Sequence, residues 1–430
     1  MIRLRFVLST SPRVNAKFER APDALVSFAP MDALVDGLGG LDELETKAFS
    51  EIAGGSYNYF EDGDVLLAKV TPCFENGKKA IASNLENGAG FATSEVIVCR
   101  PQNNRLETRY LRYLFCSEDF RHTAIASMTG AGGLRRVSER ALLDFPLHIP
   151  DLPTQRAIAD FLDRETARID SLIEKRRRFA ALSEEAQQSL VAGMIFGGRL
   201  EQMEASSSDW TVALPKHWES ERAKVHFRER IQKSTSGEEE LLTVSHITGV
   251  TARAEKEVSM FLAESNEGYK IVCPGDIVIN TMWGWMGAMG ISSRDGIISP
   301  SYGVYRPISH AFEPEYLDLM LRSRPFIGEV TRRSKGIHSS RLRIYPDAFL
   351  DIRLPVPPRE EQITILAGYH QRKERENTLL RKNEEASALL KEYRSALITS
   401  AVTGQIDVTT WSRAGTANRQ LDTIQSEMRA

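Results

Sequence analysis

Basic side chains gather in four short clusters, and such clusters suit an anionic ligand. They occupy residues 135–136, 175–178, 332–335 and 341–343. The whole chain, however, has 55 Lys and Arg against 58 Asp and Glu, a formal net charge of −3. Because duplex DNA attracts positive surface, this balance leaves two interpretations open. Either the clusters line a local positive groove, or they are ordinary solvated charges.

Residues that would support catalysis or metal binding do not form a recognisable pattern. The glycines within residues 129–136 fit neither a dinucleotide motif nor a P-loop. Asp42, Glu45 and Lys47 match a nuclease-like triplet that is common by chance, and a DNA adenine methyltransferase would need a glycine-rich cofactor loop and an Asn/Asp-Pro-Pro-aromatic motif, which are absent. The sequence therefore predicts no catalytic residue and no cofactor.

The cysteines stand apart from one another and from any histidine cluster. No CxxC pair occurs, so a zinc site or disulfide framework is not expected, and scattered thiols suit a reducing cytosol. No run of 18 apolar residues occurs, and Arg3 and Arg5 interrupt the apolar N-terminus, so we predict a cytoplasmic protein. The four cysteines are Cys73, Cys99, Cys116 and Cys273.

The strongest signal is an internal repeat. Aligning Gln155 with Gln362 sets an offset of 207 residues, which then matches Leu190 to Leu397 without a gap. Upstream, with small length changes, Cys99-Arg100-Pro101 pairs with Tyr305-Arg306-Pro307, and Gly63-Asp64-Val65 pairs with Gly275-Asp276-Ile277. Each copy has a variable mixed region, a proline-bounded joint and a long helix.

The end of each copy predicts a helix of about 40 residues. Apolar residues follow alternating steps of four and three, as in a coiled-coil seam, and such a helix would span roughly 60 Å. Pro153 and Pro358 stand where a helix begins, and Gly197 and Gly404 stand where it stops. The main seam residues are Ile158, Leu162, Ile169, Leu172 and Phe179 in the first copy and Ile365, Tyr369, Leu379, Leu390 and Leu397 in the second.

Three polar residues interrupt the seam, and two interpretations of them stay open. Arg176, Glu376 and Asn383 either pair across an antiparallel seam and fix its register, or lie on the solvated edge of a wider amphipathic helix. The basic run 175–178 is in the same way either a solvated helix face or a phosphate contact.

The rest of the chain reads as mixed α/β. Short apolar runs at 64–70, 95–99, 276–279 and 303–305 predict strands, and 108–120 and 314–322 predict helices. We expect an α/β (α+β) protein in which two long antiparallel coiled-coil helices join two globular domains. The expected segments are domain one at 1–150, a helical spacer at 151–205 with a polar linker at 204–209, domain two at 206–356, a second spacer at 357–411 and a polar tail at 412–430.

Four stretches carry a family resemblance. PPREEQITIL at 357–366 and SALITSAVTGQIDV at 395–408 closely resemble the conserved spacers of specificity subunits of type I restriction-modification systems. LAKVTPCFENGK at 67–78 and LPKHWES at 214–220 resemble parts of their target-recognition domains. The first copy departs from the pattern because it lacks the opening Pro…Trp, which leaves a start farther upstream open.

The resemblance implies a DNA-recognition role without catalysis. Each domain would read one half of a bipartite, asymmetric DNA site, and the helices would set the distance between the halves. The helices would also dock two methyltransferase (M) subunits, which carry S-adenosylmethionine, and restriction (R) motor-nuclease subunits would join for cleavage. Two related domains suit two successive major grooves.

Given that role, the basic loops supply the candidate DNA contacts. Lys and Arg suit phosphate or guanine, and Asn suits adenine. Two alternatives remain: an assembly scaffold whose domains do not read bases, and a DNA-modifying enzyme. The predicted contacts are Lys69, Asn76, Lys78, Lys79, Arg135 and Arg136 in copy one, and Trp283, Lys335, Ser339, Arg341 and Arg343 in copy two.

Overall fold

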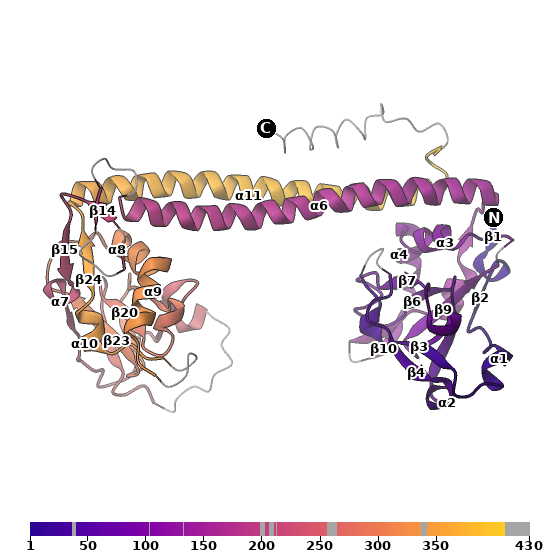
Figure 1. Cartoon of the computed structure of the whole chain (residues 1–430), viewed down its shortest axis with the longest axis horizontal. Helices are drawn as coiled ribbons and strands as arrows, with labels where there is room; N and C mark the ends of the chain where they lie inside the picture. Colours follow the sequence, from indigo (N-terminus) through magenta and orange to yellow (C-terminus); the bar gives the residue numbers. More distant parts are fainter. Residues whose placement is uncertain are drawn as a thin grey trace. The chain divides into compact units, whose positions relative to one another are not determined.

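The computed structural model describes residues 1–36, 40–102, 104–131, 133–197, 203–205, 210–211, 213–255, 265–336 and 342–408. These residues form two compact units. Unit 1 comprises Met1–Arg177 and Lys382–Ala430, and unit 2 comprises Arg178–Arg381. Each unit contains a mixed α/β head and part of each of two long helices (Figure 1). The predicted fold class is confirmed.

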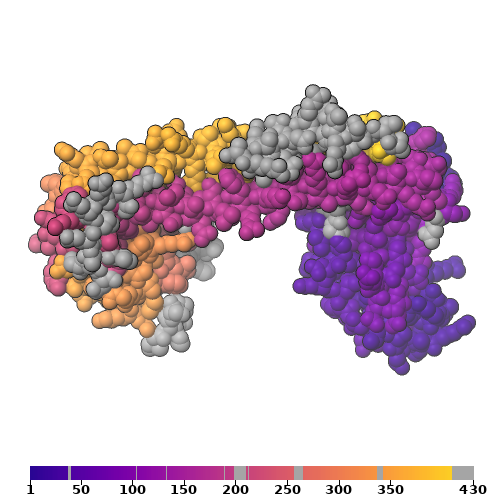
Figure 2. Space-filling model, turned by 45° about the horizontal axis from the view of Figure 1, so that its top comes forward, coloured from indigo at the N-terminus to yellow at the C-terminus, as the bar shows by residue number. Residues whose placement is uncertain are grey.

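The two long helices are α6 (Leu152–Ile195) and α11 (Arg359–Val402), each of 44 residues. Pro153 lies in the first turn of α6, where its missing N–H costs nothing. Gly197 and Gly404 follow the helix ends with φ values of +70° and +77°, which glycine adopts readily. Figure 2 shows the helices in contact, α6 in magenta beside α11 in orange and yellow. None of the described helices is long and apolar enough to cross a membrane.

The unit 1 head contains two four-stranded sheets, ordered β2-β9-β6-β7 and β4-β3-β8-β5. All pairings are antiparallel except β3 with β8. Two strand pairs, β1-β12 and β10-β11, lie outside these sheets. The strands are β1 (Ile2–Arg3), β2 (Leu8–Thr10), β3 (Leu25–Ala29), β4 (Glu45–Ala48), β5 (Tyr57–Glu61), β6 (Val65–Ala68), β7 (Lys79–Ile81), β8 (Ala89–Thr93), β9 (Val96–Pro101), β10 (Thr129–Ala131), β11 (Leu134–Arg136) and β12 (Pro146–Leu147). The helices are α1 (Ala16–Glu19), α2 (Phe49–Ile52), α3 (Thr108–Leu114), α4 (Glu118–Ala126) and α5 (Glu139–Asp144).

The unit 2 head repeats the first sheet, because the order β16-β23-β20-β21 matches β2-β9-β6-β7 strand for strand. Four two-stranded sheets complete this head, β13-β14, β15-β24, β17-β18 and β19-β22. The strands are β13 (Met203–Ala205), β14 (Ala213–Pro215), β15 (Glu219–Arg222), β16 (Phe227–Glu229), β17 (Leu242–Ser245), β18 (Gly249–Ala252), β19 (Lys270–Val272), β20 (Ile277–Asn280), β21 (Met289–Ile291), β22 (Gly296–Ile298), β23 (Tyr302–Pro307) and β24 (Arg353–Val356). The helices are α7 (Ala223–His226), α8 (Pro314–Leu321), α9 (Arg324–Arg333) and α10 (Pro346–Leu350).

Two local predictions need correction. The helix expected over 108–120 is two helices, α3 and α4, because Ser117, the N-cap of α4, has an extended backbone with ψ of 146° that interrupts the helical hydrogen bonds. The linker expected at 204–209 begins inside β13, which pairs with β14. Residues 206–209 lie outside the described part of the chain.

The predicted seam residues are buried in unit 1 and partly exposed to solvent in unit 2. In unit 1, Ile158, Leu162, Ile169, Leu172, Leu390 and Leu397 are buried and join one core with the head. In unit 2, Ile365 and Tyr369 are half-buried, and Phe179 and Leu379 are 42% and 46% exposed. The seam therefore holds the helices by apolar burial mainly in unit 1.

Of the three polar residues that interrupt the seam, two pair with each other across it. Arg176 and Asn383 are buried and bond reciprocally at 3.1 Å, Arg176 Nη1 to Asn383 Oδ1 and Asn383 Nδ2 to the Arg176 carbonyl. Their separation of 207 residues equals the repeat offset, so equivalent positions of the two copies meet each other. The paired-seam interpretation is thus correct there. Glu376 is instead half-buried, and burial together with Glu184 raises its pKa.

Candidate nucleic-acid interface

Each head is fixed to the start of its own helix by one fully buried glutamine. In unit 1, Gln155 Oε1 accepts from the N–H of Glu107, and Nε2 donates to the carbonyls of Arg105 and Pro150, at 2.8–3.0 Å. In unit 2, Gln362 makes the same three bonds, to Glu313, Ala311 and Pro357, at 2.7–2.9 Å. The glutamines that align the repeat therefore do the same structural work in both copies. The sequence marked these positions but did not reveal their role.

A tyrosine fixes each head to the end of the other helix. The hydroxyl of Tyr110 in α3 donates to the carbonyl of Val402, and that of Tyr316 in α8 donates to the carbonyl of Ile195, at 3.0 and 2.8 Å. Burial raises the pKa of Tyr110 to about 12 and raises that of Tyr316 further, so both hydroxyls stay protonated donors. Each head is thus hydrogen-bonded to both helices, which fixes its position on them.

In unit 1 the predicted contacts lie on two segments that the backbone ties together. The loop after β6 begins at Lys69, and the hairpin β10-β11 lies against it. The N–H of Val137 donates to the Lys69 carbonyl at 2.8 Å, and that of Thr71 donates to the Arg135 carbonyl at 2.9 Å. The Thr71 hydroxyl also donates to the Gly133 carbonyl. The two segments therefore lie side by side on the unit 1 head.

The arginines of this surface are paired with carboxylates. Arg136 forms a fork with Glu95, Nε to Oε2 and Nη2 to Oε1, both at 2.9 Å. Arg135 makes a single bond to Glu75 at 3.0 Å. Hydrogen bonding by Arg136 lowers the pKa of Glu95, so this carboxylate is ionised at neutral pH. Both arginine side chains remain about half exposed, 49% and 47%.

The other predicted contacts of unit 1 differ in their accessibility. Lys69 is half-buried and Asn76 is exposed. Lys78 is 18% exposed, and its amine donates to the Met31 carbonyl. Lys79 is 3% exposed, and its amine donates to the Gly77 carbonyl, so its side chain is turned inward and we leave it out of the interface. The sequence could not reveal this, because a buried lysine and a surface lysine look alike in a polar loop.

Unit 2 presents an equivalent surface. Lys335 and Arg343 form a short antiparallel bridge with backbone bonds of 2.8 and 2.9 Å. The N–H of Ile344 donates to the Thr281 carbonyl, as Val137 does to Lys69, so this segment also adjoins the loop after β20. Trp283 in that loop is 50% exposed. Ser339 and Arg341 lie outside the described residues.

The two surfaces differ in what holds the equivalent arginine. Arg343, 207 residues after Arg136, donates to the sulfur of Met282 at 3.2 Å. Ser301 stands directly before β23, where Glu95 stands directly before β9. The Ser301 carbonyl accepts from the Thr281 hydroxyl, whereas the Glu95 carbonyl accepts from the Lys69 N–H. The backbone arrangement is shared, and the position before the strand holds a glutamate in unit 1 and a serine in unit 2.

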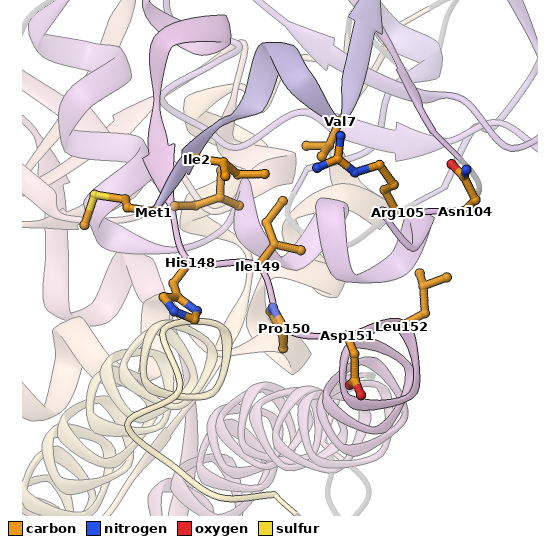
Figure 3. Close-up of a pocket in the computed structure, with 11 residues that line it drawn as sticks. Met1, Ile2, Val7, Asn104, Arg105, His148, Ile149, Pro150, Asp151 and Leu152 are labelled. Atoms are coloured by element: carbon orange, nitrogen blue, oxygen red, sulfur yellow. The ribbon is translucent and has the colours of Figure 1, made fainter.

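A surface hollow of about 520 Å³ in unit 1 lies beside β1, β12 and the start of α6 (Figure 3). Two of its polar side chains are already engaged: Arg105 donates to the Phe6 carbonyl, and Asp151 accepts from the N–H of Thr154. Apolar side chains such as Ile2 and Ile149 supply much of the remaining wall. The hollow is a joint between head and helix and has no catalytic constellation. Within the described residues, no three His, Cys, Asp or Glu side chains gather as a metal site would require.

Comparison with known proteins shows which proteins this chain resembles. Residues 54–178 match the family described as the type I restriction modification DNA specificity domain. The specificity subunits of the type I restriction enzymes EcoAI and EcoEI of Escherichia coli are 33% and 31% identical over 189 residues. That match covers 44% of this chain and 31% of each relative, so the chain aligns with about a third of the length of these curated relatives.

Solved structures share the fold over nearly the whole chain. The HsdS subunit from Thermoanaerobacter tengcongensis has a TM-score of 0.57 at 18% identity, covering 94% of this chain and 96% of its own. A structure described under the complex assembly and conformational transition of the type I R-M system has a TM-score of 0.63 at 19% identity, covering 94% and 97%. The resemblance to specificity subunits of type I systems is thus confirmed by the family match over residues 54–178 and by these curated relatives.

Proposed function

We propose that this protein is a non-catalytic DNA-recognition subunit of a type I restriction-modification complex, and that each head reads one half of a bipartite, asymmetric site. The observation that carries the proposal is the duplicated loop-and-hairpin surface, which presents Arg135 and Arg136 in one unit and Lys335 and Arg343 in the other. Basic side chains on rigidly tied backbone suit phosphate and base contacts. The family match over residues 54–178 supports the same role.

A binding experiment tests this role. The full chain, alone and with its methyltransferase subunits, is mixed with a randomised duplex library, and the bound DNA is sequenced. We expect a bipartite motif, and an affinity that falls steeply between 50 and 200 mM salt because phosphate contacts release counterions. Bound DNA without any motif would favour the scaffold, and DNA cleavage or methylation by the chain alone would favour an enzyme.

We propose further that α6 and α11 set the spacing between the half-sites. Inserting seven residues into each helix adds about 10 Å while keeping the apolar faces nearly in phase. The spacing in the selected motif should grow by up to about three base pairs, since each step is about 3.4 Å. The bases of both half-sites should not change, and altered bases at unchanged spacing would rule out this role.

The helices are also the proposed docking surface for two methyltransferase subunits, with restriction subunits joining them. Of the ten predicted seam residues, Phe179 and Leu379 are the two that the structure exposes, and Leu182 lies exposed near Phe179. Exposed large apolar side chains on a charged helix pair suit a protein partner. Replacing Phe179 and Leu379 with Ser should weaken co-purification of the methyltransferase subunit without lowering the melting temperature, and unchanged co-purification would move docking elsewhere.

A further inference from the structure

The fork between Arg136 and Glu95 occupies one edge of the guanidinium and leaves another edge open. A guanidinium has five N–H donors in a fixed plane. Nε and one N–H of Nη2 point to the two oxygens of Glu95. Both N–H groups of Nη1 and the second N–H of Nη2 remain, and one N–H of each nitrogen points outward at the end of the side chain. That end presents two parallel donors.

Two parallel donors match one base in the major groove. Guanine presents O6 and N7 as adjacent acceptors, and arginine binds this pair with two bonds, whereas adenine offers a donor beside its N7. A phosphate contact requires only a positively charged side chain long enough to touch the phosphate oxygens. An arginine whose plane is already held is therefore better suited to base reading than one whose side chain turns freely, because less rotamer entropy is lost on binding.

The backbone holds both members of the fork in place. The N–H of Lys69 donates to the carbonyl of Glu95 at 2.9 Å, and the Lys69 carbonyl accepts from Val137, the neighbour of Arg136. Val70 also forms a bridge with Arg136. Arg136 and Glu95, 41 residues apart, are thus tied to the same two-residue segment. The arginine side chain is still 47% exposed, so its outer end is accessible.

The other two described arginines of these surfaces, Arg135 and Arg343, lack this arrangement. Arg135 has a single bond to Glu75, which does not fix the plane of its guanidinium. Arg343 donates to the sulfur of Met282, and the position of Glu95 is taken by Ser301. The fork therefore distinguishes Arg136 from its sequence neighbour and from its repeat equivalent.

We propose that Arg136 reads a guanine in the half-site bound by unit 1, and that Glu95 is the positioning residue that aims its guanidinium. This inference rests on the proposed function. It assigns Arg136 to the O6 and N7 edge of guanine in the major groove and leaves Arg135 as a phosphate contact.

The test is motif selection with the full chain and four variants. Arg136→Lys keeps the charge but loses the fork, and should reduce preference for one guanine in one half-site about ten- to a hundredfold. Arg136→Ala should lose the same preference and also bind all DNA more weakly. Glu95→Gln cannot accept both arginine bonds, so it should weaken the guanine preference while leaving affinity for random duplex unchanged or higher. Arg140→Lys, at an 88% exposed arginine of α5, is the matched control and should leave the motif unchanged.

The outcomes separate the two proposals. If the wild-type chain selects no motif, the proposed function and this inference both fail. If it selects a bipartite motif that contains no guanine in either half, or if Arg136→Lys retains the full motif, the inference alone is overturned. A loss of preference in both half-sites at once would also overturn it, because it would indicate a general structural effect. Melting curves of all variants should superimpose, since the fork lies on the surface.

Discussion

The two units use the same joints but differ in the helix seam and at the loop surface. Gln155 and Gln362 make the same three bonds, and Tyr110 and Tyr316 make equivalent bonds to the helix ends. The seam, by contrast, buries Leu172 in unit 1 and leaves its repeat equivalent Leu379 46% exposed. The repeat has thus kept the bonds that position each head, while the burial of the helix seam differs between the copies.

The loop surfaces likewise share their backbone arrangement and differ in single side chains. Both heads tie a hairpin-like segment to the loop after an inner strand, and both place an arginine there. The group that orients the arginine differs, because Arg136 is held by Glu95 whereas Arg343 donates to the sulfur of Met282. If each head reads a half-site as proposed, the two heads would read unlike bases because a different group orients the shared arginine in each.

The glutamine joints should give the largest effect. Gln155→Leu or Gln362→Leu leaves three buried backbone groups without their partner, and each such group costs about 1–3 kcal/mol. We expect each variant to lose about 4 kcal/mol of unfolding free energy in urea melts. The two losses should agree, because the two sets of bonds are the same. Gln371→Leu, at an exposed position of α11, is the control, and a loss below about 1 kcal/mol at either joint would contradict the equivalence.

The seam comparison predicts the next largest difference. Leu172 and Leu379 are the same residue type at equivalent repeat positions, 3% and 46% exposed. Leu172→Ala should cost about 2–5 kcal/mol because it opens a cavity in the unit 1 core. Leu379→Ala should change stability by no more than about 0.5 kcal/mol. Equal losses, measured by denaturant melts of both variants, would show that the helix pair is equally packed in both units.

Transferring the carboxylate should make the loop surfaces more alike. Ser301→Glu places a carboxylate directly before β23, as Glu95 stands before β9. If Arg343 then adopts the fork, motif selection should show a guanine preference in the unit 2 half-site stronger by about fivefold, or about 1 kcal/mol. Ser301→Gln, which cannot accept two bonds from arginine, is the control and should not show it. A change in the unit 1 half-site would break the proposed independence of the heads.

Repetition and periodicity made the architecture predictable. An offset of 207 residues is visible in letters alone, and the same offset separates Arg176 from Asn383, which meet in the seam. Steps of four and three gave the positions of α6 and α11, because a buried helix face must recur at that spacing. Strands such as β6 and β20 were expected for the same reason, as apolar runs bounded by turn residues.

The parts that failed depend on contacts between distant residues. Lys79 was expected on the surface, but it lies in β7, which pairs with β6, and it is only 3% exposed. Glu95 was not singled out at all, because a lone glutamate 41 residues before an arginine carries no local signal. Whether a seam side chain is exposed to solvent, as that of Leu379 is, depends on how the facing helix packs. Sequence spacing gives the face of an element but not what lies opposite it.

The smallest expected effect concerns the solvent-exposed part of the seam, in unit 2. Burial and Glu184 raise the pKa of Glu376 above its usual 4.5. A carboxyl whose pKa is raised by folding lowers stability as the pH rises from the unfolded pKa through the folded one, since the folded state must then hold an unfavourable charge. At the equivalent place in unit 1 the residues are Ile169 and Lys391, which carry no such repulsion.

Glu376→Gln should therefore raise the melting temperature at pH 7 by about 1–2 °C, a size suited to one largely solvated like-charge pair. Below about pH 4 the gain should disappear, because the wild-type carboxyl is then protonated as well. Glu374→Gln, at an exposed position of the same helix, is the matched control and should show no pH-dependent gain. If the melting temperatures of both variants rise equally, the effect comes from net charge and not from the helix seam. The seams of the two units would then differ in burial but not in electrostatics.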